Sequence, residues 1–242
     1  MKIVVSFCMA TSFLVATEVS AARFGGAVYG GFNTYSMKDW NDVLDDANAA
    51  GADFDNVGNG FTAGVELRAW VTRRWRISAG WEPLLLDDVT NGNSTNPGGY
   101  LSLDGHAFSA TGAYFFVPAS GRMKATTPGA AKARTEPVRP SGSRYGLGAG
   151  LDVILNRGEI ASIIDPLIRI EGSSIGFHVL GLGEWPLIPG YAVTASAGYR
   201  FGKVSRTDVV LGEERQDSTA DTDYSGLILR AGIAFDLPGG TP

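Results

Sequence analysis

The chain contains two histidines, so any acid–base chemistry that uses an imidazole depends on His106 or His178. A serine nucleophile needs a histidine within hydrogen-bond reach. Ser109 follows His106 by three residues, and in a strand this spacing puts the two side chains on opposite faces. His106 shares a face with Ser102 and Asp104, the one trio that could act as a lipid-active enzyme. For His178 we expect an internal position with hydrogen-bond partners.

Metal binding has little support in the sequence. Asp53, Asp55 and Gly58 are spaced like the opening of a calcium-binding loop, but Val57 replaces a ligand and no glutamate follows at the closing position. Acidic residues also gather in segments that we expect to be loops, where such clusters usually form a solvated surface: Asp39, Asp42, Asp45, Asp46, Asp87, Asp88, Glu213, Glu214, Asp217 and Asp221. We therefore predict no metal site and no cofactor.

A second set of charged residues has a regular spacing. Each member alternates with apolar residues in a short segment, as expected for one face of a strand. The set comprises Glu66, Arg68, Arg76, Glu82, Asp152, Glu184, Arg200 and Arg230. Charges enclosed by low-dielectric walls persist only when they are paired. We therefore predict that these residues form an ion-pair network inside the fold.

The alternation itself predicts the strands that carry these charges. In the segment from Phe61 to Val71, the odd positions are apolar: Phe61, Ala63, Val65, Leu67, Ala69 and Val71. The even positions are Thr62, Gly64, Glu66, Arg68 and Trp70. Residues 74–83, 144–155, 191–201 and 226–236 follow the same pattern, and residues 24–35, 100–117 and 168–185 follow it less regularly. We predict eight strands with an apolar outer face and a polar inner face, which is typical of a membrane β-barrel.

The first 21 residues have the features of an export signal. Lys2 provides a positive start, Ile3 to Ala16 is mostly apolar, and Val19 to Ala21 is a small-residue cleavage pattern. No linker divides residues 22–242, so we expect one barrel domain there. After Ala22, no apolar run approaches the roughly 20 residues that a spanning helix needs, so only a barrel could cross a membrane.

Connection lengths support an up-and-down topology, because such barrels have short periplasmic turns and long outer loops. Short turns are predicted at residues 72–73 and 186–190, and long loops at residues 36–59, 85–98, 156–167 and 205–223. The connection at residues 118–143 is the exception. It is either a periplasmic insertion or an extra hairpin of a ten-stranded barrel, although its prolines disfavour central strands.

The first long loop contains a helical pattern. Ser36 is a candidate cap, Asp39 falls in the first turn, and the apolar positions share one face: Met37, Trp40, Val43, Leu44 and Ala47. We expect a short helix packed over the mouth of the barrel, with a partner-binding helix as the alternative.

The last predicted strand resembles the C-terminal assembly signal of outer-membrane barrels, in which Arg230, Gly232, Phe235 and Leu237 match a polar, glycine, aromatic and hydrophobic pattern. The chain ends at Pro242 instead of an aromatic residue, which departs from that signal. The segments GYRF at Gly198 and GLGAGLD at Gly146 look like strands of small OmpA/OmpW-like barrels. This resemblance implies the Gram-negative outer membrane, the barrel-assembly machinery, and contact with membrane lipids and lipopolysaccharide.

Composition narrows the function further. A formal charge of −5 disfavours nucleic-acid binding, which needs a basic face. The interior of an eight-stranded barrel is just wide enough to be filled by side chains. We therefore predict a non-enzymatic monomer with a structural or surface-interaction role. A narrow channel for a small or hydrophobic solute is the first alternative, and a lipid-active enzyme is the second.

Overall fold

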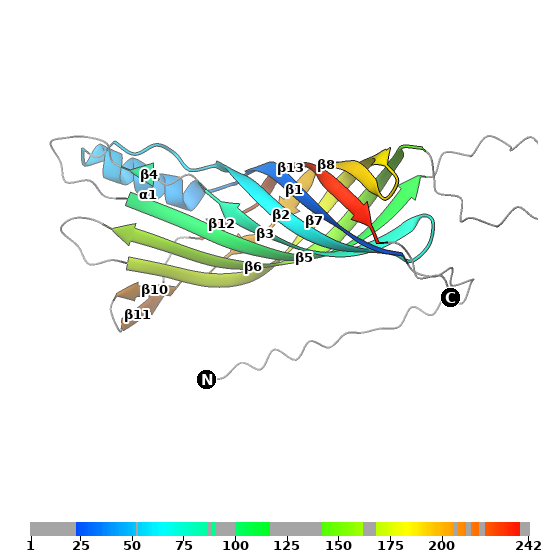
Figure 1. Ribbon diagram of the computed structural model, residues 1–242. Coiled ribbons are helices and arrows are strands. Elements are labelled where there is room, and N and C mark those ends of the chain that lie inside the picture. The colour runs from blue at the N-terminus through cyan, green and yellow to red at the C-terminus, as the bar shows by residue number, and fades with distance from the viewer. Residues whose placement is uncertain are drawn as a thin grey trace, which may run out of the picture.

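The computed structural model describes residues 23–51, 53–86, 89–90, 100–116, 142–161, 168–205, 208–211, 214–217 and 221–237. Eight long antiparallel strands wind around a common axis and close into a barrel (Figure 1). These strands are β1 (Arg23–Thr34), β2 (Asn59–Trp70), β3 (Trp75–Leu85), β5 (Tyr100–Phe116), β6 (Arg144–Ala161), β7 (Ile168–Ile188), β8 (Tyr191–Phe201) and β13 (Gly226–Asp236). The predicted eight-stranded barrel is confirmed.

The pairing of the strands rules out the ten-stranded alternative. β5 and β6 pair directly along their whole common length, so no strand from the connection between them enters the ring. β1 pairs with β2 on one side and with β13 on the other, and β8 pairs with both β13 and β7, which closes the ring. Residues 117–141 of that connection, and the predicted export signal, lie outside the described residues.

Turns are short at one end of the barrel. Residues 71–74 join β2 to β3, and Pro189 and Gly190 join β7 to β8. Gly190 has a φ of 86°, a conformation that glycine adopts without steric cost. The predicted turn at residues 72–73 lies within the observed one, whereas the predicted turn at residues 186–190 begins too early, because β7 continues to Ile188 in pairing with β8.

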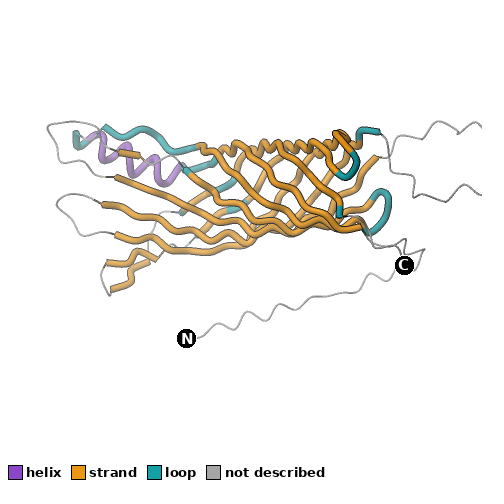
Figure 2. The backbone as a smooth tube through the Cα atoms, in the orientation of Figure 1, coloured by secondary structure: helices purple, strands orange, loops and turns teal. Residues whose placement is uncertain are grey.

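The other end carries the helix and the additional short strands (Figure 2). The predicted loop beginning at Asn156 is wrong in its first part, because β6 continues to Ala161 in register with both β5 and β7. β5, β6 and β7 contain 17, 18 and 21 residues, whereas a strand needs about 9–11 to cross a bilayer. These three strands therefore extend well beyond the membrane.

Short strands complete this extension. Beyond the point where β7 leaves β8, β7 pairs with β10 (Asp208–Leu211), which pairs with β11 (Glu214–Asp217). β4 (Val89–Thr90) adds to β5, and β9 (Lys203–Val204) pairs with β12 (Thr222–Asp223). The barrel wall thus opens into a partial sheet outside the membrane.

Helix α1 (Lys38–Ala49) covers the inner side of this extension (Figure 1). Met37, Trp40 and Leu44 are buried, as expected for a helix packed over the mouth. Two details of the prediction are wrong. Met37 and not Ser36 occupies the N-cap, with no side-chain cap hydrogen bond, and Val43 is 48% exposed because the buried face is narrower than the sequence pattern suggested. Among the described residues, no helix is long and apolar enough to cross a membrane.

Candidate functional site: a charged lumen closed at both ends

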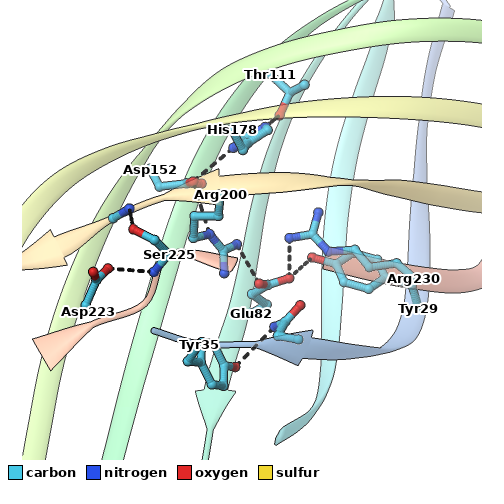
Figure 3. Close-up of polar contacts among 12 residues, drawn as sticks. Tyr29, Tyr35, Glu82, Thr111, Asp152, His178, Arg200, Asp223, Ser225 and Arg230 are labelled. Carbon is cyan, nitrogen blue, oxygen red and sulfur yellow. Dashed lines mark hydrogen bonds and ion pairs between the residues drawn. The ribbon is translucent and has the colours of Figure 1, made fainter. Parts of the chain in front are cut away.

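Glu82 is the centre of the first of two charge clusters inside the barrel (Figure 3). Its carboxylate accepts hydrogen bonds from Nη2 of Arg200 at 2.6 Å and from the Tyr29 hydroxyl at 3.1 Å. The Nη2 atom of Arg230 lies 2.6 Å from Oε2, the oxygen that also accepts from Tyr29, whereas Arg200 binds Oε1. Glu82 is 2% exposed, so these partners replace the water that a carboxylate would otherwise bind.

A chain of hydrogen bonds extends this cluster to a histidine. Oδ2 of Asp152 lies 3.2 Å from Nε of Arg200 and 2.9 Å from Nδ1 of His178. The opposite ring nitrogen of His178 is 2.9 Å from the Thr111 hydroxyl. Because a carboxylate can only accept, Nδ1 of His178 donates to Asp152, and Nε2 pairs with the Thr111 hydroxyl. His178 is thus an internal residue with partners on both ring nitrogens.

Glu66 and Glu184 hold the second cluster, nearer the short turns. Glu184 binds Nη1 of Arg68 at 3.1 Å and also pairs with Arg76. Glu66 binds Nη2 of Arg68 at 2.8 Å and lies 3.6 Å from Nη2 of Arg76. Together, the two clusters contain all eight charged residues that the sequence places on inward faces, four carboxylates and four guanidinium groups. Formal charge is therefore balanced within these eight residues.

A small polar cavity separates the clusters. Its volume is about 30 Å³, and its lining includes Tyr29, Glu66, Arg68, Arg76, Thr111 and Arg230. A buried water needs roughly 10–15 Å³ of such space. This cavity therefore has room for about two waters.

Apolar side chains close the end of the lumen near the short turns. Trp70 and Phe115 point inward, with ring centroids 4.9 Å apart, and both are buried. The guanidinium of Arg144 lies 4.6 Å from the Trp70 ring, and that of Arg76 lies 5.0 Å from the Phe115 ring. We call these four residues the periplasmic lid. Strand alternation predicts that Trp70 points inward, but it does not show that Trp70 closes the lumen.

A second apolar cluster, which we call the cap core, closes the other end. It is formed by α1, the upper halves of β5, β6 and β7, and neighbouring loop residues, and includes Met37, Trp40, Leu44, Leu84, Leu101, Leu103, Ile154, Ile170, Val204 and Tyr224. The cap core lies above the charge clusters on the same strands. The lumen is therefore covered at both ends.

Hydrogen bonds join three segments of the chain within the cap core. Nε1 of Trp40 donates to the Thr222 hydroxyl at 3.0 Å, and the Asn156 amide donates to the same oxygen at 3.2 Å. The Tyr224 hydroxyl donates to the Asn156 side-chain oxygen. Burial raises the pKa of Tyr35, whose ring packs against Tyr224, to about 12. These contacts make α1, β6 and the segment before β13 one packed unit.

The outward face of the strands shows where the membrane ends. Residues opposite one another on β5, β6 and β7 form rows, and consecutive rows are about 7 Å apart. Moving away from the middle of the barrel, the rows are Phe108–Val153–Ile175, His106–Leu155–Ser173, Asp104–Arg157–Glu171 and Ser102–Glu159–Arg169. The first row is apolar and the last two are charged or polar. The boundary of the membrane on the side of the cap therefore lies close to His106.

An aromatic belt marks the opposite boundary. Trp75 and Tyr114 have ring centroids 5.2 Å apart, and Tyr145 and Trp185 have centroids 5.9 Å apart, all on the outward face. Aromatic girdles of this kind are found at both interfaces of outer-membrane barrels. The span of β5 from Phe108 to Phe116 matches the roughly 9 residues that cross a bilayer.

The catalytic candidate lies on this outer surface, away from the lumen. His106 is exposed at the upper membrane boundary and stacks on Trp81 with centroids 5.9 Å apart. Ser102 and Asp104 lie on the same outward face. The three residues are therefore on the outside of the barrel wall, and the charge clusters are inside it. Among the described residues, no group of three His, Cys, Asp or Glu side chains is arranged to hold a metal ion.

The four residues that resemble an assembly signal lie on β13 or directly after it. Arg230 belongs to the first charge cluster, and Gly232 lies opposite Tyr29, whose backbone and Cβ leave no room for a side chain. Phe235 and Leu237 face outward, and the Leu237 amide binds the Phe24 carbonyl.

Known proteins share this architecture without close sequence similarity. No protein-family model matches the chain, and no curated protein matches its sequence. The outer membrane protein OprG from Pseudomonas aeruginosa is similar in structure, with a TM-score of 0.52, 10% identity and coverage of 89% of this chain and 95% of that chain. A major outer membrane protein from Thermus thermophilus gives 0.51 and 10% identity, covering 90% of this chain and 100% of that chain. The chain has the fold of the small outer-membrane β-barrels.

Proposed function

We propose that this protein is a closed barrel of the outer membrane, whose role is to carry an ordered cap at the cell surface for structural or recognition purposes. The observation that supports this proposal most is the filled lumen. Two ion-pair clusters, the periplasmic lid and the cap core occupy successive levels of the same barrel. Such an interior suits a scaffold better than a conduit.

The partners in this proposal follow from the position of the chain in the membrane. The apolar outward side chains of the strands contact lipid tails. The charged rows on β5, β6 and β7 lie in the headgroup layer of the outer leaflet, which contains lipopolysaccharide. The C-terminal strand would be recognised by the barrel-assembly machinery. We propose a monomer, because the barrel closes on its own strands and needs no second copy to complete its ladder.

Planar-bilayer recording tests the closed lumen. Purified, folded protein should produce no stable conductance, because the ion-pair clusters fill the lumen and apolar side chains cover both of its ends. Folding is verified first by heat-modifiable migration on a gel, so that silence cannot be attributed to unfolded protein. A stable, large open channel from the wild-type chain would contradict the proposal.

The polar cavity favours a narrow solute path as a second candidate function. Its lining carries three guanidinium groups, from Arg68, Arg76 and Arg230, which could select a small anion if the closures moved. Arg200→Ala distinguishes the two functions. A path through the lumen predicts changed ion selectivity in the variant, whereas the scaffold predicts lower stability and no selective current in the wild type.

A further inference from the structure

The outward arginines at the two ends of the barrel differ in whether carboxylates lie beside them. At the outer boundary, Arg157 lies opposite Asp104 on β5 and Glu171 on β7 in the strand register. Nε of Arg169 lies 3.9 Å from a Glu159 oxygen. Each outward arginine of this region therefore has carboxylates beside it, and their charges offset one another.

The turn between β2 and β3 has no such compensation. Arg73 and Arg74 are both exposed at the tip of this turn, and neither forms an ion pair with any part of the chain that the structure describes. Arg23 and Arg144 add positive charge at the same end of the barrel, near Asp236. The turn thus presents two adjacent guanidinium groups that have no carboxylate partner among the described residues.

Several contacts hold Arg74 in place. Its backbone amide donates to the Thr72 hydroxyl at 3.2 Å, and its carbonyl accepts from the Phe115 amide at 2.8 Å. Its guanidinium Nη1 donates to the Tyr114 hydroxyl at 3.0 Å. Tyr114 is itself fixed against Trp75 in the aromatic belt. The Arg74 guanidinium is therefore held beside the aromatic belt by its hydrogen bond to Tyr114.

The depth of Arg74 in the membrane determines which part of a lipid it contacts. The aromatic belt lies at the level where acyl chains give way to headgroups, and Arg74 contacts a member of that belt. A guanidinium at this depth lies beside lipid phosphates, with which it forms charge-assisted hydrogen bonds. Zwitterionic headgroups offer a phosphate together with a cation, whereas anionic headgroups offer uncompensated negative charge to two neighbouring arginines.

We propose that Arg73 and Arg74, with Tyr114 as a positioning residue, form a binding site for the phosphate of an anionic phospholipid in the inner leaflet. Arg74 binds the phosphate oxygens from the membrane side, and Arg73 adds a second positive charge from the tip of the turn. Trp75 of the belt and the exposed Phe116, whose ring packs against Tyr114 with centroids 5.6 Å apart, flank the first acyl carbons. The site depends on the barrel fold and its membrane position, and not on whether the lumen conducts.

Native mass spectrometry of the folded full chain tests this site. Protein in detergent is mixed with phosphatidylglycerol or with phosphatidylcholine of the same acyl chains, and retained lipids are counted. A basic residue near an anionic surface contributes about fivefold in affinity. The wild type should prefer phosphatidylglycerol, and Arg73→Gln combined with Arg74→Gln should reduce that preference by roughly 30-fold.

Two variants complete the design. Tyr114→Phe keeps both charges and removes the hydrogen bond that orients Arg74, so it should lose about two- to threefold of the preference. Arg169→Gln removes an arginine whose charge is already offset at the outer boundary, and the preference should not change. All variants are first shown to migrate as folded barrels.

The result that would overturn the proposal is equal phosphatidylglycerol retention by the wild type and the double variant. Inorganic phosphate, added alone at millimolar concentration, separates a lipid site from a general anion site. It should not displace the bound lipid, because it lacks the acyl chains that the belt contacts. Complete displacement by inorganic phosphate would contradict the assignment to a membrane lipid.

Discussion

The membrane-spanning barrel and the cap above it are built from the same strands with opposite polarity. Within the membrane, β5 and β6 direct Phe108 and Val153 outward and carry Asp152 inward. A few residues further along, Arg157 faces outward while Ile154 is fully buried inside. The strands do not change their alternation at this point. What changes is which face meets the low-dielectric surroundings.

This difference shows how one continuous sheet is stable in lipid along one part of its length and in water along the other. A barrel in lipid buries its polar groups because lipid cannot hydrogen-bond to them. Outside the membrane the hydrophobic effect acts again, and apolar side chains collapse inward under α1. The lumen is therefore stabilised by paired charges and the cap by apolar packing, so substitutions in the two regions should have distinguishable effects.

The largest expected effect comes from removing the shared acceptor of the upper charge cluster. Glu82→Ala leaves Arg230 without its carboxylate partner and leaves Arg200 paired with Asp152 alone. Breaking a buried pair in this way costs about 3–5 kcal/mol, measured as the loss of unfolding free energy in urea. As a control, Arg169→Ala removes an exposed pair, whose loss should cost less than about 1 kcal/mol. Equal losses would show that the lumen pairs do not stabilise the barrel.

The cap should respond to the loss of apolar volume. Leu44→Ala removes a buried side chain of α1 from the cap core and should cost about 2–4 kcal/mol locally. We expect faster proteolysis of the cap, with the heat-modifiable gel shift of the barrel retained. Val43→Ala is the matched control on the exposed side of the same helix. A lost gel shift in Leu44→Ala would mean that the two regions unfold as one unit.

Alkaline pH should loosen the cap selectively through Tyr35. Burial raises its pKa to about 12, above the roughly 10 of an unfolded tyrosine. The stabilising contribution is complete below about pH 10 and is lost as the pH rises through about 12, because tyrosinate is disfavoured in the packed cap. Proteolysis followed between pH 9 and pH 12 measures this. Tyr35→Phe should reduce the alkaline sensitivity, and an unchanged profile would refute the assignment.

The smallest effect is expected at the end of the internal hydrogen-bond chain. Thr111→Val removes the hydroxyl bonded to His178 with little change in shape, and should cost about 1 kcal/mol. Urea unfolding of the barrel provides the measurement. Thr72→Val, in the exposed turn, serves as a comparison outside the lumen. A loss above about 3 kcal/mol would indicate that Thr111 has a larger role in the network than one hydrogen bond.

Much of the fold was predictable because strand alternation is a local property. Phe61 to Val71 shows both faces without reference to any other segment. The pairing of charges was not local, since Arg68 and Glu184 meet across the lumen although 116 residues separate them. The eight inward charged residues could be listed from the sequence, but their division into two clusters and the contributions of Tyr29 and Thr111 could not.

The cap was harder to predict because its polarity is reversed. Under the alternation that fits the membrane part, Asn156 and Arg157 indicate the start of a loop, and this reading ends β6 too early. Spacing alone places Val43 on the buried face of the helix. The packing of Trp40 and Leu44 against strands distant in sequence decides which side is buried, and no periodicity within α1 contains that information.

Site-directed spin labelling at the polarity change tests the central claim most directly. Single labels are introduced through Phe108→Cys, Val153→Cys, Asp104→Cys and Arg157→Cys in protein reconstituted into bilayers, and their collision rates with oxygen and with a water-soluble nickel chelate are compared. We predict that labels at 108 and 153 favour oxygen, while those at 104 and 157 favour the chelate. Equal access to oxygen at all four positions would contradict a membrane boundary at this level and, with it, the distinction between lumen and cap.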